Sequence, residues 1–337
     1  MVACIIALVG CGGSGDGDGS LGGGRFGAST EPALETDLAA LDTALLCTPF
    51  THPDKPPVLL VHGTFTAGYE QYQWNYLPLL AARGFDVCAV TYPDRGLGDQ
   101  QISAEYVVHA LRSMHAATGR KVAMIGHSQG ATMPRWALKW WPSARDAVAD
   151  FVLIAGPNHG TLIADPTGQG VQNPLGMPAA FYQFSAGSNF ITALNAGDET
   201  PGDIDYTNLY TLTDELVQPV LPVPTAALDW GQNNPRVANI LMQDVCPLNV
   251  VDHVTIGTTD RIAFELAVDA ISNPGPADVA RAGGMALCLN PLPLIADPAL
   301  ASDSVNILLD ILQRDAEAGL PDLHLTTEEP PLKPYAL

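Results

Sequence analysis

The feature that most constrains the fold is the pentapeptide GHSQG at 126–130, which directly follows the apolar run at 122–125. A short apolar run of this kind is typical of a buried β-strand, and the residues from 129 to about 139 follow a helical pattern. A serine between two glycines at a strand-to-helix turn is typical of a strained turn that pushes the serine hydroxyl out of the backbone. We therefore predict an accessible Ser128 hydroxyl beside the positive N-terminal end of a helix.

The rest of the body of the chain alternates between short apolar runs and helical patterns. We predict buried strands at 57–61, 85–90, 121–125, 151–154, 208–212 and 248–251, and helices at 103–118 and 261–271. This alternation favours an α/β fold with a mostly parallel central sheet and helices on both faces. The Pro/Gly-rich stretch from about 156 to 205 interrupts the alternation, and we predict that it forms a small cap over the carboxyl edge of the sheet.

Residues 1–30 differ in composition from the rest of the chain. Residues 1–10 are almost wholly apolar and end in Leu-Val-Gly before Cys11, which resembles a bacterial lipobox. We expect residues 1–11 to be a lipoprotein signal segment with Cys11 lipidated, although no Lys or Arg precedes the apolar run. Residues 12–30 are rich in Gly, Ser and Asp and predict a flexible tether, with one folded domain at 31–337. The alternative is a disordered tail without an anchor.

Charge and cysteine usage limit the possible partners. The 337 residues include 36 acidic and 15 basic side chains, a net charge of −21, which disfavours binding to nucleic acid and to anionic membranes. There is no C-x-x-C or H-E-x-x-H pattern, so we expect no metal site. Four cysteines in the body of the chain are compatible with two disulfides in an oxidising compartment or with buried thiols in the cytosol. The four are Cys47, Cys88, Cys246 and Cys288.

A serine hydroxyl needs a general base, and in this type of fold the order along the chain is Ser, then Asp or Glu, then His. Three histidines follow Ser128. His159 follows the strand at 151–154 directly, which is too early to follow an acid at the end of the next strand, and His324 lies in a polar C-terminal stretch. His253 follows the predicted strand at 248–251 and precedes a helical pattern, so we predict that His253 is the base.

The acid that orients the base is expected at the end of the strand before it. Asp214 is the first acid after the predicted strand at 208–212, and we predict that it takes this role. Glu215 is its neighbour but would point in a different direction. Weaker candidates are Asp203, Asp205 and Asp229.

A developing oxyanion needs backbone N–H donors from the loop after the first central strand and from the residue after the nucleophile. The loop that begins at His62 follows the strand at 57–61. We predict that the amides of Thr64 and Gln129 are the two donors, with the Thr64 hydroxyl as a possible third. We expect His62 itself to be a structural residue.

These residues resemble those of the Candida antarctica lipase B family and of related secreted bacterial lipases, which have the α/β-hydrolase fold. The resemblance is carried by VHGT, by SQG with the downstream Trp136, and by TNLYTLTDELVQP, VCPLNVVDH and EPPLKPYA. It implies a Ser-Asp-His triad with Thr64 and Gln129 as oxyanion residues, and it assigns the triad to Ser128, Asp214 and His253. It also implies the disulfides Cys47–Cys88 and Cys246–Cys288.

Two positions are of interest because of this resemblance. His127 stands where the yeast family has Trp, so we predict that it lines a wider pocket for the alcohol part of the substrate; the alternative is that it packs beneath the turn. Residues 299–320 resemble a mobile lid helix of the family. Its apolar stripe would face either lipid or the core. The stripe consists of Val305, Leu308, Leu309 and Leu312.

We expect a serine carboxylic ester hydrolase, most simply a lipase that acts on acylglycerols or other lipid esters through an acyl-enzyme and needs no cofactor. We expect a monomer that is exported, either as a lipoprotein of the cell envelope or in secreted form. The alternatives are a carboxylesterase for short soluble esters, a polyester depolymerase, and a non-catalytic adhesion protein with a hydrolase fold.

Overall fold

The computed structural model of the chain describes residues 31–164, 176–290, 292–313 and 325–337. The expected signal segment with Cys11 and the tether at 12–30 lie outside the described residues, so both stay predictions. No helix in the described part of the chain is both long and apolar enough to cross a membrane. The description below concerns the unit Glu31–Leu337.

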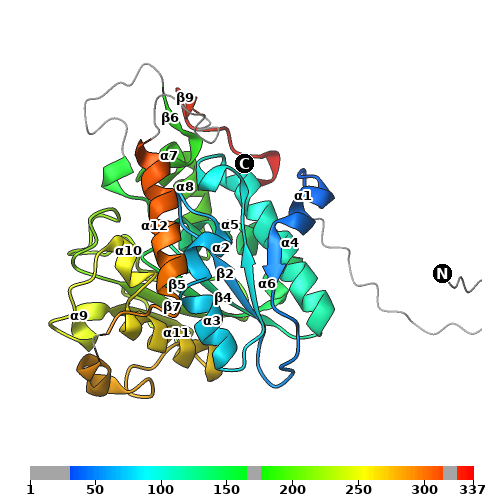
Figure 1. The fold of residues 1–337 in the computed structure, drawn as a ribbon. Helices are drawn as coiled ribbons and strands as arrows, with labels where there is room; N and C mark the ends of the chain where they lie inside the picture. Colours follow the sequence, from blue (N-terminus) through cyan, green and yellow to red (C-terminus); the bar gives the residue numbers. More distant parts are fainter. Residues whose placement is uncertain (1–30, 165–175, 291, 314–324) are drawn as a thin grey trace, which may run out of the picture. The chain divides into compact units, whose positions relative to one another are not determined.

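A seven-stranded sheet forms the centre of this unit, with the strand order β1-β3-β2-β4-β5-β7-β8 (Figure 1). Neighbouring strands are parallel except for β1, which is antiparallel to β3. The strands are β1 (Leu45–Cys47), β2 (Val58–Val61), β3 (Val87–Val90), β4 (Val122–His127), β5 (Val148–Ile154), β7 (Asp205–Tyr210) and β8 (Val237–Leu241). This arrangement confirms the predicted mostly parallel sheet.

The sheet is buried on both faces because its central strands are largely apolar, and β2 is apolar at every position. In β2, Leu59 and Val61 belong to one core, whereas Val58 and Leu60 belong to the core on the opposite face. Successive side chains of a strand point to opposite faces, so a continuous apolar run needs cover on both. The first core includes residues of α4 (Gln100–Thr118) and α5 (Gln129–Trp140), and the second includes residues of α3 (Tyr76–Ala82) and α11 (Arg261–Ser272).

The remaining elements are short except for α12, which has 16 residues. They are α1 (Leu38–Thr43), α2 (Gly68–Tyr72), α6 (Pro142–Asp146), α7 (Ala179–Phe184), α8 (Asn189–Asn195), α9 (Met242–Val245), α10 (His253–Ile256), α12 (Pro298–Gln313), the 3₁₀ turns η1 (Pro93–Gly96), η2 (Leu162–Ala164), η3 (Gly284–Leu289) and η4 (Pro334–Ala336), and the pair β6 (Met177–Pro178) and β9 (Leu325–Thr326). The segment expected to form a cap contains η2, β6, α7 and α8, with 165–175 outside the described residues. Its role as a cap stays a prediction.

The predicted strand at 248–251 is wrong. The last strand of the sheet is β8, and residues 248–251 form an irregular connection between α9 and α10. Leu248 and Val250 are 94% and 81% exposed, and the amide of Asn249 donates to the carbonyl of Cys246 at 2.8 Å. A short segment with three apolar residues out of four forms a strand only if the sheet covers it, and here the backbone instead turns back toward Cys246.

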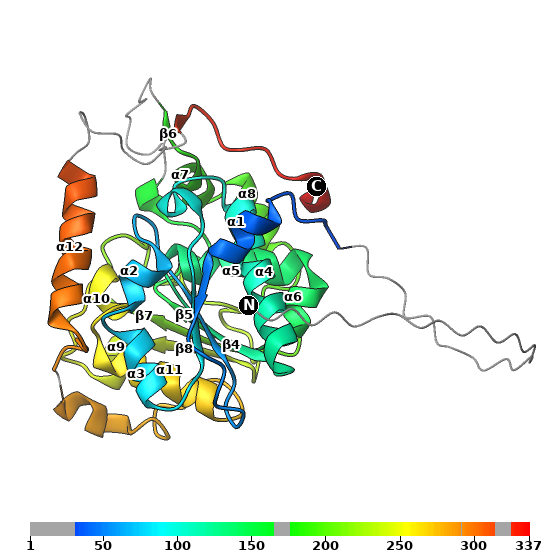
Figure 2. The same cartoon turned by 45° about the vertical axis from the view of Figure 1, so that its right-hand side comes forward.

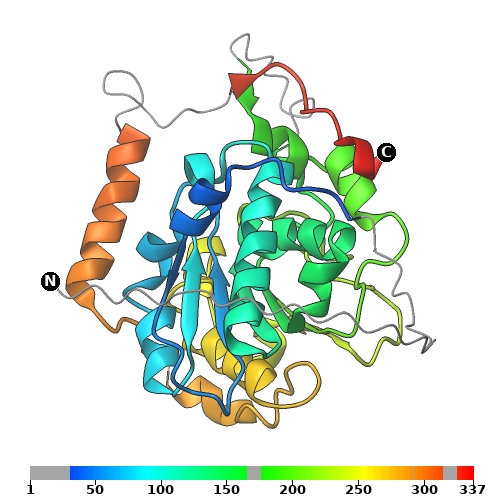
Figure 3. The same cartoon turned by 90° about the vertical axis from the view of Figure 1, so that its right-hand side faces the viewer.

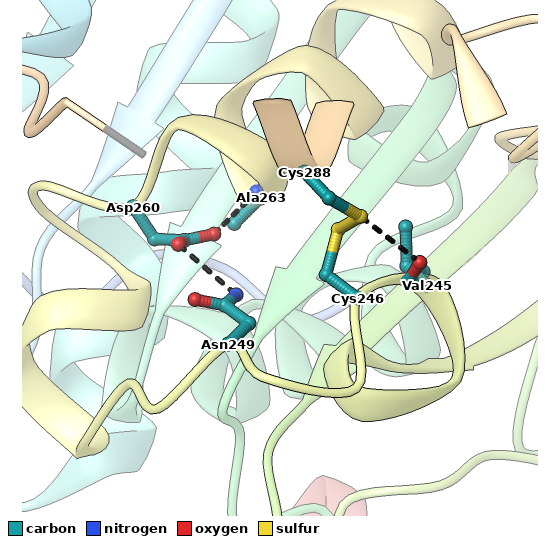
Figure 4. Close-up of a disulfide and its surroundings, with 6 residues drawn as sticks. All are labelled: Val245, Cys246, Asn249, Asp260, Ala263 and Cys288. Atoms are coloured by element: carbon teal, nitrogen blue, oxygen red, sulfur yellow. Dashed lines mark hydrogen bonds between the residues drawn. A yellow bond between two sulfur atoms is a disulfide. The ribbon is translucent and has the colours of Figure 1, made fainter. Parts of the chain in front are cut away.

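Two disulfides confirm the expected cysteine pairing. Cys47–Cys88 joins β1 to β3 at directly opposed positions of the ladder. Cys246–Cys288 joins the end of α9 to η3 (Figure 4). The first bond therefore fixes the edge strand to its neighbour, and the second joins two segments outside the sheet.

Helix α12 lies along the outside of the described unit, as the orange helix in Figures 2 and 3 shows. From Pro298 to Asp310 no side chain is buried, and Val305 and Leu309 are 53% and 45% exposed. The hydroxyl of Ser304 donates to the carbonyl of Glu70 at 2.8 Å, which ties the helix to α2. The core-facing alternative for the apolar stripe is therefore wrong at Val305 and Leu309. The Leu312 side chain and residues 314–320 lie outside the description.

Candidate active site

Ser128 occupies a strained turn between β4 and α5. Its backbone angles are φ 56° and ψ −122°, in a region that residues with a Cβ rarely adopt. The turn is held because the Ser128 amide donates to the carbonyl of Ile154 at 2.8 Å. The side chain is half-buried, so the hydroxyl stands at the boundary of the core, beside the first turn of α5.

The two glycines of the pentapeptide are required by close backbone approaches. A Cβ on Gly126 would collide with the carbonyl oxygen of Gly130, one turn into α5. A Cβ on Gly130 would collide with the carbonyl oxygen of Val61, at the end of β2. Only residues without a side chain allow the helix to start so close to the sheet, which explains the spacing of the motif.

Ser128, His253 and Asp214 come together in one line of hydrogen bonds. Nε2 of His253 lies 2.9 Å from Oγ of Ser128. Nδ1 of His253 lies 3.0 and 3.1 Å from the two carboxylate oxygens of Asp214. His253 and Asp214 are 4% and 3% exposed, so the imidazole and the carboxylate meet in a site that is almost closed to water. A carboxylate on Nδ1 leaves Nε2 free to accept the proton of a hydroxyl.

Asp214 is fixed independently of the imidazole. Its Oδ1 accepts hydrogen bonds from the amides of Leu216 at 2.9 Å and Val217 at 2.8 Å. Glu215, the alternative acid, instead accepts a hydrogen bond from the backbone amide of His253 at 3.1 Å. The structure therefore brings Asp214 to the ring and Glu215 to the main chain of the same histidine.

The loop that carries His253 is anchored at several points. Asp252 caps α10 in a reciprocal pair with Thr255. The hydroxyls of Thr211 and Thr213 both donate to the carbonyl of Val251, at 3.0 and 2.6 Å, which joins this loop to the one that carries Asp214. These bonds compensate for the absence of a strand before the histidine.

The start of this loop is fixed at Cys246 and Asn249 (Figure 4). The disulfide holds Cys246, and the amide group of Asn249 donates to the carboxylate of Asp260 at 3.2 Å. Asp260 also accepts from the amide of Ala263 and so caps α11. The loop between the disulfide and α11 therefore has both of its ends attached to the folded body.

The alternative acids and bases have other partners. His159 lies 2.9 Å from the carboxylate of Glu199. Asp203 and Asp205 both bind Arg236. Asp229 accepts from the Thr200 hydroxyl and the Asn234 amide group, and His324 lies outside the described residues.

Thr64 and Gln129 lie side by side at the predicted oxyanion position. The Thr64 hydroxyl donates to the side-chain oxygen of Gln129 at 3.2 Å, and the Gln129 side-chain nitrogen donates to the carbonyl of Gly96 at 3.0 Å. Within the described parts of the chain, the backbone amides of Thr64 and Gln129 have no acceptor. Both N–H groups are therefore available to a negatively charged oxygen near Ser128.

The loop after β2 is stiffened by a second set of contacts. The amide of Phe65, whose φ is 68°, donates to the carbonyl of Arg95 at 2.8 Å. The Arg95 guanidinium binds the carboxylate of Glu70 through two nitrogens, at 2.6 and 2.9 Å. His62 is fully buried, stacks on Tyr92 at 3.8 Å between ring centroids, and lies 2.6 Å from the carbonyl of Gly63 through Nδ1. Burial lowers the pKa of His62 to about 3, which suits the structural role expected for it.

The hypothesis that His127 lines an open alcohol pocket is not supported, and its position corrects that expectation. The ring is 5% exposed, and Nε2 lies 2.7 Å from the carbonyl oxygen of His253. Nδ1 lies 3.2 Å from the side-chain nitrogen of Gln71, and a Cβ on Gly257 would collide with the ring. Burial, followed by the nearby charge of His253, lowers the pKa of His127 to about 3. Sequence reasoning missed Gln71 and Gly257, because neither stands in a motif.

The groups around Ser128 are side chains and backbone amides of the chain itself. Within the described residues, no group of three or more His, Cys, Asp or Glu side chains is arranged to hold a metal ion. The groups that converge on Ser128 are an imidazole, a carboxylate and backbone amides. Such a set activates a hydroxyl and stabilises an oxyanion.

The parallel sheet, the strained serine turn and the order of acid and histidine along the chain define the protein as an ester hydrolase of the α/β-hydrolase fold. Comparison with known proteins specifies the family. The sequence model of the family "Lipase (class 2)" matches residues 55–262, and the chain belongs to this family.

Individual relatives agree with this assignment. The chain is 33% identical to lipase B of Pseudozyma antarctica over 278 residues, which cover 80% of this chain and 77% of the relative. It is 29% identical to a triacylglycerol lipase of Pseudomonas fragi over 192 residues, or 54% of this chain and 63% of the relative. The crystal structure of Aspergillus fumigatus lipase B superposes with a TM-score of 0.79 at 30% identity, covering 92% of this chain and 74% of the other.

Proposed function

We propose that this enzyme is a lipase that hydrolyses acylglycerols or other lipid esters, with Ser128 as nucleophile, His253 as general base and Asp214 as orienting acid. The observation that carries the proposal is the distance of 2.9 Å between Nε2 of His253 and Oγ of Ser128 on a strained turn. A hydroxyl in hydrogen-bond contact with a buried, carboxylate-held imidazole is activated for attack on a carbonyl carbon.

The reaction proceeds by two acyl transfers. The Ser128 hydroxyl attacks the ester carbonyl while its proton passes to Nε2 of His253, and the amides of Thr64 and Gln129 stabilise the resulting oxyanion. The C–O bond to the alcohol then breaks, and His253 gives its proton to the departing alkoxide. Water, deprotonated by the same imidazole, attacks the acyl-serine; the bond between the acyl carbon and Oγ of Ser128 then breaks, His253 returns the proton to Oγ, and the acid is released. Asp214 keeps Nδ1 protonated throughout and stabilises the imidazolium.

A lipid substrate is favoured over short soluble esters by the side chains that flank the site. Leu212 and Leu216 stand on either side of Asp214, and Val254 follows His253. These three side chains are 42%, 44% and 49% exposed. Exposed apolar groups beside a catalytic centre reduce their contact with water when an acyl chain covers them. Two relatives, moreover, are named lipase B and triacylglycerol lipase.

We also propose that the protein is exported, since its two disulfides are stable in an oxidising compartment. Anchoring through a lipid on Cys11, the cap at 156–205 and a monomeric state belong to the same proposal. Metabolic labelling with an alkyne fatty acid tests the anchor. Label in the wild type that disappears in Cys11→Ser is expected, and equal labelling of both would contradict the anchor.

The central proposal is tested by labelling with a fluorophosphonate and by activity. The probe should react with one serine of the folded wild type, identified by peptide mapping as Ser128. Ser128→Ala should lose the label and lower kcat by on the order of 10⁴-fold with an unchanged melting temperature. Near-normal turnover by the folded Ser128→Ala variant would refute the assignment and leave the non-catalytic adhesion protein as the better explanation.

The substrate class needs a separate measurement. A series of p-nitrophenyl esters of increasing acyl length, together with an emulsified triglyceride, separates a lipase from a carboxylesterase. We expect hydrolysis of the emulsion and of the long acyl esters. Activity confined to short esters below their solubility limit would support the carboxylesterase, and activity confined to a polyester film would support the depolymerase.

A further inference from the structure

A buried chain of hydrogen bonds connects the loop of Thr64 to the main chain of His253. The amide of Gly63 donates to Oε1 of Gln71 at 2.8 Å. Nε2 of Gln71 lies 3.2 Å from Nδ1 of His127, and Nε2 of His127 lies 2.7 Å from the carbonyl oxygen of His253. Gln71 and His127 are 6% and 5% exposed, so water competes little for these bonds.

The direction of every bond in this chain is determined by its two ends. A backbone amide only donates and a backbone carbonyl only accepts. The Gly63 amide therefore requires the oxygen of Gln71, which places the Gln71 NH₂ group against His127. Nδ1 of His127 must then accept, so the proton is on Nε2, from which it is donated to His253. A neutral imidazole with the proton on Nε2 is the one state that satisfies both ends.

We propose that Gln71 and His127 are positioning residues. They hold the main chain of the general base His253 at a fixed distance from the loop that carries Thr64. The inference rests on the proposed function of Ser128 and His253. His253 begins α10, a four-residue helix outside the sheet, whereas Thr64 follows β2 directly. The sheet alone does not fix the distance between these two segments. A displacement of about 1 Å between catalytic groups can lower the rate by on the order of 10²-fold.

The surroundings of His127 keep it in the required state. Burial is the main cause of its low pKa, of about 3, and a charge on His253 acts in the same direction. Asp214 and Asp252 are the nearby acids, and they oppose the shift without overcoming it. A second proton on Nδ1 would point at the NH₂ group of Gln71 and break the chain in its middle.

The first test breaks this chain of hydrogen bonds at two separate points, Gln71 and His127. Gln71→Met and His127→Phe keep most of the side-chain volume and remove the hydrogen bonds. Each should lower kcat about 10- to 100-fold with KM changed less than about twofold. The double variant should be no slower than the slower single one, because either change already breaks the chain. Multiplying effects, or unchanged kcat in folded single variants, would overturn the proposal.

A matched control separates positioning from stability. Gln101 is also fully buried and accepts from the Lys333 amide at 2.7 Å and donates to the Pro331 carbonyl at 3.1 Å, far along the chain from the triad. Gln101→Met should lower the melting temperature and leave kcat unchanged. If Gln101→Met lowers kcat as much as Gln71→Met does, the effect is one of stability and the proposal fails.

The second test uses pH. In Gln71→Glu the carboxylate still accepts from Gly63 but requires a proton on Nδ1 of His127. Nε2 of His127 can then donate to the His253 carbonyl only while His127 is an imidazolium. Once His127 loses the proton on Nε2, the carbonyl oxygen faces the lone pair of that nitrogen. The variant should therefore show one ionisation in its profile of kcat against pH that the wild type lacks. If the dependence of kcat on pH has the same shape in Gln71→Glu as in the wild type, the proposed chain of hydrogen bonds is contradicted.

A third measurement needs no variant and remains valid if the variants fail to fold. Nitrogen-15 NMR of histidine-labelled enzyme, with its Ser128 blocked or free, should show the His127 ring as a neutral imidazole protonated on Nε2 from pH 5 to 8. A proton on Nδ1 of His127, or a His127 imidazolium in this range, would overturn the proposal. Fluorophosphonate labelling of Ser128 in the same samples reports on the catalytic assignment separately, so the two proposals can fail independently.

Discussion

The carbonyl oxygen of Val61 faces the α-carbon of Gly130 so closely that a methyl group on Gly130 would overlap it. Val61 ends β2 and Gly130 lies in the first turn of α5, so this contact sets how near the helix comes to the sheet. The same contact determines where the amide of Gln129 stands relative to that of Thr64. Backbone atoms of two packed elements cannot move aside independently, and no flexible side chain is present to yield.

Gly130→Ala should therefore lower both stability and activity. We expect a loss of about 3 kcal/mol of unfolding free energy, at the upper end for overpacking, and a lower kcat because α5 shifts relative to Thr64. Gly119→Ala is the control, because Gly119 has a positive φ, which an alanine adopts only with strain, but has open space around it. It should lower stability without changing kcat. Urea titration and ester hydrolysis measure both, and a fully active Gly130→Ala enzyme would contradict the packing argument.

Asp214→Asn should lower kcat by on the order of 10⁴-fold because the amide favours the wrong tautomer of His253. Glu215→Gln is the matched control. Its carboxylate contacts the amide of His253 and not the ring, so kcat should fall far less. If Glu215→Gln proves the more damaging change, the acid has been assigned to the wrong residue.

Removal of either disulfide should lower the unfolding free energy by roughly 4 kcal/mol in the chain-entropy model, because the sequence separations are 41 and 42 residues. The consequences for activity should differ. Replacement of both Cys246 and Cys288 by serine frees one end of the loop that carries His253, so kcat should fall as well. Replacement of Cys47 and Cys88 by serine changes the contact between β1 and β3, away from the loop that carries His253, and should leave kcat intact. Equal effects on kcat would show that the loop does not depend on its disulfide.

His127→Trp should destabilise the fold and slow all esters to a similar degree. An indole is larger than the imidazole that already contacts Gly257, so it overpacks the region beneath the nucleophile turn. The check is the melting temperature beside the rates for a primary ester and a bulky secondary ester. Selective slowing of the secondary ester at unchanged stability would restore the pocket hypothesis.

Asp150 should make the stability of the protein depend on pH. Burial, followed by the charge of Asp205, its partner on β7, raises the pKa of Asp150 to about 7, against an opposing effect of Lys121. The folded state thus binds the proton more tightly than the unfolded chain. The stabilisation is complete below about pH 4 and is lost as the pH rises through about 7.

Asp150→Asn should accordingly raise the melting temperature at about pH 8 and have little effect at about pH 4. The exposed Asp146 provides a control, since Asp146→Asn removes one negative charge without changing a buried group. Melting temperatures of wild type and Asp150→Asn are compared at about pH 4 and about pH 8. If the wild type loses no more melting temperature between these pH values than the variant does, the prediction is contradicted.

The parts of the fold and site that the sequence predicts are those with local signals. The strand Val58–Val61 is apolar at every position, the strand Val122–His127 begins with the apolar run 122–125, and the Ser128 turn is marked by two glycines. Asp214 and His253 are identified through the order of acid and base along the chain, which the fold imposes. The cysteine pairing came from the family resemblance and not from spacing.

The parts that the sequence does not predict depend on tertiary contacts. Residues 248–251 have the composition of a strand, but Cys246 is held by a disulfide and the adjacent backbone turns away from the sheet. The prediction of His253 as the base thus relied on a strand that the structure does not contain, although Nε2 of His253 lies 2.9 Å from Oγ of Ser128. The environment of His127 depends on Gln71, which is distant in sequence and belongs to no motif. Such pairings are fixed only when the helices pack.

Helix α12 has a consequence for hydrogen exchange. Since no described side chain from Pro298 to Asp310 is buried, the helix can open without disturbing either core. Its amide protons should exchange with deuterium through local opening, with a protection far below that of the amides in β4, which exchange only through global unfolding. In hydrogen exchange measured by mass spectrometry, peptides from α12, which carries the exposed Val305 and Leu309, should therefore take up deuterium much earlier than peptides from the central sheet.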